Sequence, residues 1–305
     1  MTRSDSPPQP SDPAREQRRR LKGIALMTGA VAGFSCIDAS AKFLINHMDI
    51  AQVVWARYAF AFIFSLFISN PFTHPALMRT SRPWLQIGRS ALLVLSTALN
   101  VVALRYLQLD QTVSIMFSTP FLVAILAGPL LGEWIGPRRW AAISIGFVGV
   151  ILVMRPGLGG IHPAAAFTVI GTILYSVYLI TTRVLSRTDS TATTVFYSNV
   201  VGFVAMSAAL PLVWTTPKDP VVAVTMVAIG GFGALGHYLL IAAHRLAPAP
   251  ILAPFIYSQL VWMVALGYLV FGDVPNRWTL IGASIVIASG LYLLFRERQL
   301  KRQGR

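Results

Sequence analysis

The sequence is poor in charge and almost free of cysteine. Only 12% of its 305 residues are charged, whereas 55% are hydrophobic and the mean hydropathy is +0.65. A soluble domain carries about 25% charged residues to cover its surface, so this composition excludes an ordinary soluble protein. The single cysteine, Cys36, excludes an intramolecular disulfide and a cysteine-rich metal motif.

Motifs typical of several enzyme classes are missing as well. The sequence contains no Walker A phosphate loop and no Gly-x-Ser-x-Gly nucleophile elbow. Its five histidines are scattered without metal-ligand spacing. We therefore expect no catalytic residue, no metal and no cofactor, and no ATP-driven activity of this chain by itself.

Long apolar runs, by contrast, fill most of the chain. A helix needs roughly 20 apolar residues to cross a bilayer. Continuous apolar runs, unlike short alternating ones, exclude a β-barrel. The predicted fold class is therefore an all-α integral membrane protein of about ten transmembrane helices. These are predicted at residues 23–45, 50–70, 84–104, 110–131, 139–154, 163–182, 192–213, 220–243, 248–271 and 278–295.

The basic residues lie mainly outside these segments and mainly on one side. Of 25 lysines and arginines, 19 fall on the side of the N-terminus, Arg89 among them, and 4 on the other; Lys42 and Arg57 remain within helices. This asymmetry predicts an inner-membrane protein with both termini in the cytoplasm. The formal charge of +14 comes from basic residues in the tails and loops, where they set the orientation of the helices in the membrane. We therefore expect no nucleic-acid partner. Residues 1–21 are predicted to be a disordered basic tail, and residues 297–305 a second basic tail.

The two halves of the chain resemble each other. At an offset of 140 residues, Ser118 matches Ser258, Gly132 matches Gly272, and Glu133 matches Asp273. Since each half holds five predicted spans, an odd number, the second copy must be inverted in the membrane. We place the first repeat at 22–155 and the second at 156–296. Inverted repeats commonly support alternating access, in which a site between the halves faces each side in turn.

Prolines recur in corresponding segments of the two halves. They are predicted to bend the fourth and ninth helices and to free backbone carbonyls there. Glu133 and Asp273 are expected to be loop groups that cap helices or pair with nearby arginines. The prolines concerned are Pro120, Pro248, Pro250 and Pro254.

Short motifs of the first half, in their order and spacing, resemble a known family. They are Asp38-x-x-x-Lys42, Arg57-Tyr58, Ala103-Leu104-x-Tyr106-Leu107, Ser118-Thr119-Pro120 and Leu131-Gly132-Glu133. After the tail, the chain resembles EamA-type members of the drug/metabolite transporter superfamily over nearly its whole length. The resemblance implies ten helices in two inverted repeats, cytoplasmic termini and a central cavity for a small-molecule substrate.

The resemblance implies a function but not a single substrate. The pattern is most similar to riboflavin or S-adenosylmethionine carriers, so a secondary transporter of such a small polar metabolite is expected. Export of an amino acid or of another metabolite is the alternative within the superfamily. A membrane-embedded enzyme and a non-transporting scaffold are the alternatives outside it. A homodimer is also considered, because glycines on helix faces fit either internal packing or a dimer.

Ionisable side chains within apolar helices are the first candidates for a site, since each costs about 3 kcal/mol or more to bury there. Asp38 and Lys42 share one face of the first helix. Asp38 could bind a proton or cation with Lys42 as its partner, and Lys42 or Arg57 could meet an anionic substrate group. The alternative is an internal ion pair that holds the first two helices together.

Polar and aromatic groups at mid-membrane depth complete the candidate set. His237, which follows a run of glycines, could bind substrate or relay a proton. Tyr175 and Tyr178 share a helix face and could stack a planar ring. For each residue, ordinary helix packing is the alternative. The candidates for substrate binding or coupling are Asp38, Lys42, Arg57, Asn100, Tyr175, Tyr178, His237, Tyr257, Gln259 and Trp262.

Overall fold

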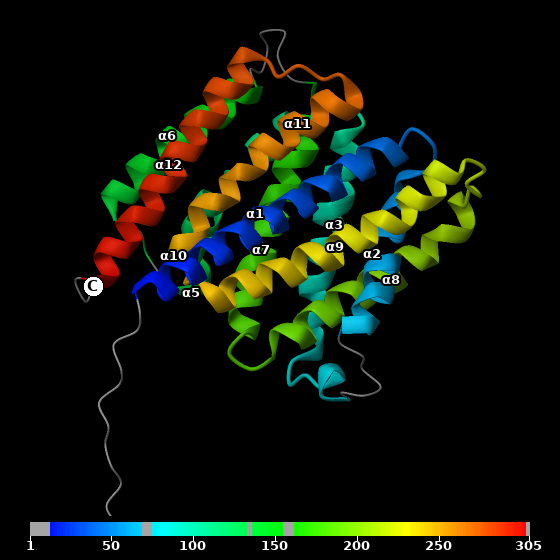
Figure 1. Cartoon of the computed structure of the whole chain (residues 1–305), viewed down its shortest axis with the longest axis horizontal. Coiled ribbons are helices and arrows are strands. Elements are labelled where there is room, and N and C mark those ends of the chain that lie inside the picture. The colour runs from blue at the N-terminus through cyan, green and yellow to red at the C-terminus, as the bar shows by residue number, and fades with distance from the viewer. Residues whose placement is uncertain (1–12, 69–74, 133, 135, 155–161, 303–305) are drawn as a thin grey trace, which may run out of the picture.

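The computed structural model describes residues 13–68, 75–132, 134, 136–154 and 162–302. Over these ranges the chain forms helices and no strand (Figure 1). Eight helical stretches are long and apolar enough to span a membrane, and two shorter apolar ones, Trp140–Met154 and Arg277–Leu293, complete the ten predicted segments. The chain is therefore an all-α, multi-pass membrane protein.

The helices follow one another with short connections. The first half contains α1 (Pro13–Leu44), α2 (Ile50–Ile68), η1 (Pro75–Met78), α3 (Pro83–Leu104), α4 (Leu109–Met116), α5 (Thr119–Leu131) and α6 (Pro137–Met154). The second half contains α7 (Ala165–Leu185), α8 (Thr191–Val213), α9 (Pro220–Leu246), α10 (Ala249–Leu252), η2 (Ala253–Ser258), α11 (Gln259–Phe271) and α12 (Arg277–Arg302). The start of α1 and the end of α12 lie at the same end of the bundle, here called the termini end; the opposite end is the distal end (Figure 1).

Helix α1 begins at Pro13, so the prediction of a disordered tail is wrong for residues 13–21. Proline suits the first position of a helix, and the Arg-, Glu- and Gln-rich run that follows has high helix propensity. Glu16 and Arg20 form an ion pair one turn apart on this segment. Residues 1–12 lie outside the described residues. Similarly, α12 continues through the predicted second tail to Arg302.

Two of the ten segments are interrupted rather than merely bent. The segment 110–131 divides into α4 and α5, and Pro120 lies in the first turn of α5. The segment 248–271 divides into α10, η2 and α11, and Pro254 lies in the first turn of η2. Proline has no N–H to donate and clashes with the preceding turn, so a new helix starts at each site.

The repeat that the sequence predicted is visible in these interrupted helices. Both α5 and α11 have 13 residues and follow a serine, Ser118 and Ser258 respectively. Each ends at a left-handed glycine, Gly132 with φ 73° and Gly272 with φ 70°. Only glycine adopts this conformation without strain, which explains why the same residue closes both helices.

Helix packing has the same two-fold character. Helix α1 packs along α9, and α3 packs along α7, while α2 packs on α8 and α6 on α12. In the repeat, α1 corresponds to α7 and α3 to α9, so the contact between α1 and α9 is equivalent to the contact between α7 and α3. The pairs α2–α8 and α6–α12 each join two corresponding helices. The pairs α1–α9 and α6–α12 can be followed side by side in Figure 1. The chain is therefore built from two inverted five-helix repeats that interleave.

Glycines allow the backbones of α6 and α12 to touch. A Cβ added at Gly282 would lie 2.5 Å from the carbonyl oxygen of Gly149, and one added at Gly149 would lie 2.7 Å from that of Gly282. In hydrocarbon, where apolar surface gains nothing by leaving the lipid, such close backbone contact is a main source of helix association.

We predict that Gly282→Ala destabilises the bundle, because the new methyl group must push α6 away from α12. Overpacking of this kind costs about 1–3 kcal/mol. Gly88→Ala is the matched control, since a Cβ at Gly88 has no atom within 4 Å. Thermal unfolding of the purified protein in detergent measures both; equal melting temperatures for Gly282→Ala and wild type would contradict the prediction.

Candidate substrate-binding site

Polar side chains gather around Arg57 of α2 in the middle of the bundle. The charge of Arg57 acts on Asp38 of α1 and on Tyr175 of α7. It also acts on His237 of α9. The guanidinium carbon lies 5.7 Å from the ring centroid of the adjacent Tyr58. Helices of both repeats therefore supply the groups around a single cation.

Asp38 and Asn100 form a hydrogen-bonded pair within this group. The Nδ2 of Asn100 donates to Oδ1 of Asp38 over 3.2 Å, which joins α3 to α1. The carbonyl Oδ1 of Asn100 is buried and has no partner among the described residues. A buried acceptor without a donor costs about 1–3 kcal/mol, so a water or a substrate N–H would be bound favourably there. No direct ion pair joins Asp38 to Arg57, although both lie in the described part of the chain.

Two tyrosines of α7 provide a flat aromatic surface beside these polar groups. The rings of Tyr175 and Tyr178 stack with centroids 5.5 Å apart and an interplanar angle of 21°. Arg89 comes from the first half of the chain, whereas both tyrosines come from the second. Its guanidinium carbon lies 4.8 Å from the ring centroid of Tyr178. Both tyrosines are only partly buried, so they can extend their stack to another planar ring.

His237 reaches the group from α9. Its ring makes an edge contact with Phe34 of α1, with centroids 5.2 Å apart. The neighbouring Gly236 permits this approach, because a Cβ there would lie 2.7 Å from the Phe34 ring. His237 as a whole residue is exposed, so neighbouring side chains do not fully enclose it.

The structure thus brings together six of the ten candidates, namely Asp38, Arg57, Asn100, Tyr175, Tyr178 and His237. The contacts of the remaining second-half candidates lie elsewhere. Tyr257 of η2 packs edge-on against Phe117 at 5.0 Å. Gln259 is the first residue of α11, and Trp262 on the same helix is 38% exposed.

Lys42 has a different partner from the one the sequence indicated. Its Nζ lies 2.6 Å from Oδ2 of Asp273 and 4.9 Å from the ring centroid of Phe271. The spacing of four residues does place Asp38 and Lys42 on one face of α1, but the turn after α11 brings a closer carboxylate to Lys42. The sequence analysis expected Asp273 to cap a helix or to pair with an arginine. In the structure, Asp273 pairs with Lys42. Glu133, its counterpart in the first repeat, lies outside the described residues.

Arg89 is a buried cation, although the sequence analysis counted it among the basic residues on the side of the N-terminus. It lies within α3 and is only 1% exposed. Its guanidinium donates to Oγ1 of Thr182 at 3.0 Å, to the carbonyl oxygen of Thr194 at 2.7 Å and to Oγ of Ser198 at 2.6 Å. The signal was present in the sequence, because position 89 falls inside the predicted helix 84–104. Arg89 joins α3 to α7 and α8 near the termini end.

A carboxylate fastens the same end of the bundle. Asp189, in the turn between α7 and α8, accepts hydrogen bonds from Oγ1 of Thr80 and from Nε2 of Gln86, the latter over 2.7 Å. Partial desolvation raises the pKa of Asp189, but these hydrogen bonds outweigh it and hold the pKa below its ordinary value. The loop before α3 is thereby tied to the second repeat.

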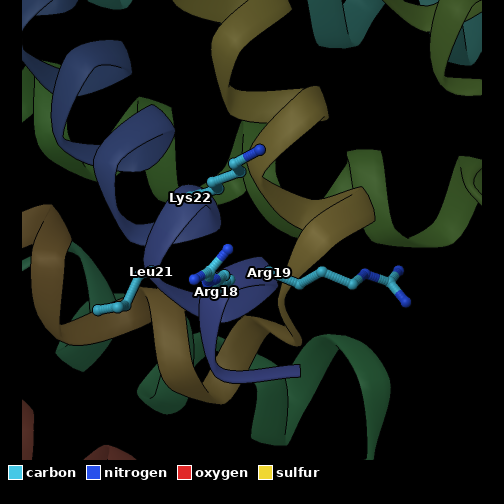
Figure 2. A pocket seen from close by; sticks show the side chains of 4 residues that line it. All are labelled: Arg18, Arg19, Leu21 and Lys22. Carbon is cyan, nitrogen blue, oxygen red and sulfur yellow. The ribbon is translucent and has the colours of Figure 1, made fainter. Parts of the chain in front are cut away.

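A hollow of about 470 Å³ lies at the start of α1, away from the central group. Figure 2 shows the four side chains that line it, Arg18, Arg19, Leu21 and Lys22, spreading in different directions from the helix. They offer positive charge but neither an aromatic surface nor an acceptor, so the central group remains the better candidate for a metabolite. In the residues that the structure describes, no three His, Cys, Asp or Glu side chains gather as metal ligands.

An all-helical membrane bundle of two interleaved inverted repeats, with polar groups between the repeats at its centre, defines the class of secondary transporters. Within that class, the chain belongs to the EamA-like transporter family, whose model matches residues 21–155 and 162–296.

Named relatives are similar over nearly their whole length. The chain is 28% identical over 294 residues to a riboflavin transporter of Rhizobium johnstonii, covering 94% of this chain and 96% of that protein. It is also 28% identical over 280 residues to an S-adenosylmethionine uptake transporter of Rickettsia bellii, covering 91% and 94%. A solved crystal structure with 15% sequence identity has a TM-score of 0.57 over 95% of this chain and 99% of its own, which supports the fold.

We predict that Asp189→Asn lowers stability at neutral pH by about 0.5–1 kcal/mol, a small effect because the carboxylate is largely solvated. A carboxylate whose pKa is depressed by folding stabilises above its ordinary pKa, and this contribution disappears as the pH falls through the folded-state pKa. Wild type and variant should therefore converge in acid. Thermal unfolding over a pH series tests this, with Asp219→Asn as the control; a constant difference at all pH values would contradict it.

Proposed function

We propose that the chain carries a cofactor-like metabolite with a planar ring, such as riboflavin or S-adenosylmethionine, across the inner membrane by alternating access. The observation that carries this proposal is the partly buried Tyr175–Tyr178 stack beside Arg57, Asp38 and Asn100. The names of the two relatives point in the same direction. A flavin or an adenine has a broad apolar face and a hydrogen-bonding edge, which is the combination that this group of residues can bind.

The proposed roles follow from the chemistry of each side chain. Tyr175 and Tyr178 stack the ring face, and the free carbonyl of Asn100 accepts a hydrogen bond from the ring edge. Asp38 is the group suited to a cationic or hydroxyl substituent, and Arg57 to an anionic or carbonyl one. His237 adds a donor or acceptor from the other repeat.

The orientation is also part of the proposal. Both termini are placed in the cytoplasm, because loops of the termini end hold most of the lysines and arginines. Removing the buried Arg89 from the earlier count leaves 18 of these residues (19 less 1) against 4, so the asymmetry persists. The small-molecule substrate needs no further partner for this mechanism; a homodimer and the lack of a nucleic-acid partner remain predictions.

We predict that riboflavin binds the purified protein and that Tyr175→Ala weakens binding roughly ten-fold or more. Loss of one aromatic stacking partner is worth about 1–3 kcal/mol, and 1.4 kcal/mol corresponds to a factor of about ten. Quenching of flavin fluorescence measures the dissociation constant. Tyr268→Ala is the matched control, because Tyr268 lies on the outer face of α11 and is 61% exposed. Equal weakening by both changes would remove the tyrosine stack from the site.

We also predict that Asp38→Asn and Arg57→Gln each reduce uptake into liposomes roughly ten-fold or more, since each removes a charge that the other partly compensates. The labelled panel contains riboflavin, S-adenosylmethionine and several amino acids. Each variant is first checked for wild-type elution on size exclusion and for its melting temperature. Saturable movement of amino acids alone would favour the alternative of an amino-acid transporter. Failure of wild type to move any member would contradict the proposed substrate class.

A further inference from the structure

The distal end of the bundle holds three charged side chains from three separate elements. Lys42 lies in the last turn of α1, Asp110 in the first turn of α4, and Asp273 directly after α11. Lys42 and Asp273 form the 2.6 Å ion pair described above. Asp110 is close enough to interact electrostatically with both of them. The charged side chains that act on Asp110 are those of Asp273 and Lys42.

Asp110 is the member of this cluster that has no ion-pair partner among the described residues. Its side chain is 3% exposed, and its Oδ2 has no hydrogen-bond donor. The carboxylate also accepts from backbone N–H groups of its own helix turn, at Asp110 and Gln111. Lys42 forms an ion pair with Asp273 but not with Asp110, although all three lie in the described part of the chain, and the cluster carries a net charge of −1 when all three groups are ionised. A buried carboxylate with a free oxygen beside a like charge is a place where a cation binds.

The cluster also lies where the two repeats meet. The Lys42–Asp273 pair links α1 of the first repeat to the end of α11 in the second, and α4 packs against α11. Any relative movement of the repeats must change the distances from Asp273, in the second repeat, to Lys42 and Asp110, in the first. Occupancy of the cluster and the direction in which the central site faces are thus physically connected.

The internal repeat shows that the third charge is present on one side alone. At an offset of 141 residues Lys42 corresponds to Arg183, and at an offset of 140 Asp273 corresponds to Glu133. The sequence thus supplies a cation and an acid at both ends. At the same offset of 140, however, Asp110 corresponds to Pro250, which cannot ionise. The additional acid breaks the symmetry of the repeats and belongs to the distal end only.

From these observations we propose that Asp110, with the Lys42–Asp273 pair, forms a proton-binding site that couples transport to a proton gradient. This inference rests on the transporter function proposed above. One proton from the distal side bonds to Oδ2 of Asp110, and the charge of the cluster changes from −1 to 0. The neutral carboxyl no longer repels Asp273 or attracts Lys42, so protonation strengthens the Lys42–Asp273 contact at the distal end and favours opening at the other end.

The substitution Asp110→Asn separates this role from the hydrogen bonds of the first helical turn. The side-chain oxygen of asparagine can still accept from backbone N–H groups, but it takes up no proton. The matched control is Asp219→Asn, since Asp219 caps α9 at the same end through the backbone N–H of Val221 at 2.8 Å and is exposed. Asp110→Glu is the conservative variant that keeps a titratable carboxyl.

Two measurements with riboflavin in liposomes then test coupling. An inward proton gradient should stimulate uptake several-fold for wild type, Asp219→Asn and Asp110→Glu, and should have no effect on Asp110→Asn. Counterflow exchange without any gradient should persist in all four, because it needs alternating access but no driving ion. Wild-type stimulation retained in Asp110→Asn overturns the proposal, and so does stimulation by a sodium gradient in place of a proton gradient.

A third measurement needs no substrate, so it distinguishes failure of the site from failure of the transport function. Infrared difference spectra of the purified protein between alkaline and acidic buffer should show the carbonyl stretch of a protonated buried carboxyl. Because Asp38 also lies inside the bundle, the spectra are compared on an Asp38→Asn background. There the band should be missing when Asp110→Asn is added and present when Asp219→Asn is added. If the Asp38→Asn protein lacks the band, or retains it after Asp110→Asn, Asp110 is not the proton site. If the band behaves as expected but no riboflavin moves, the proposed substrate fails and the proton site stands.

Discussion

A charge inside an apolar bundle must be compensated by the protein itself, and the interior of this chain is arranged around that constraint. Hydrocarbon offers no water, so each ionised side chain that is left alone costs several kcal/mol. Each buried cation therefore lies among acceptors or aromatic faces. Arg89 is surrounded by hydroxyls and a carbonyl, Lys42 by Asp273 and Phe271, and Arg57 by the field of Asp38.

The inverted repeat determines where this compensation can occur. Because α1 packs with α9 and α3 with α7, partners for a charge on one repeat come mainly from the other. The guanidinium of Arg89 in α3 donates to α7 and α8, and Lys42 of α1 pairs with Asp273 in the turn after α11. Polar contacts between repeats are the contacts that a rocking motion of one repeat against the other must rearrange. The same charges that need partners in the membrane are therefore suited to hold one end closed at a time.

Backbone contact and polar contact have complementary roles in this bundle. Gly149 and Gly282 let α6 and α12 touch directly, away from the groups around Arg57. Such a contact has no charge to satisfy and provides a firm support. The centre of the bundle, in contrast, keeps an unpaired carbonyl on Asn100 and a partly exposed tyrosine stack. These groups remain available to a ligand because neighbouring side chains do not fully satisfy them.

The sequence by itself determined the fold class, the ten segments and the repeat, since hydrophobic length and matching Gly-acid corners are local properties. It also made Asp38, Arg57, Tyr175 and Tyr178 candidates, because polar groups stand out in an apolar background, and their role stays a prediction. Local periodicity could not determine partners. It paired Lys42 with Asp38, whereas the turn after α11 delivers Asp273, which is 231 residues away in the chain. The count of basic residues also put Arg89 on the side of the N-terminus, and only the packing of α3 against α7 and α8 shows that it is a buried cation. Which charges meet depends on how the two repeats interleave, and only the tertiary structure decided that.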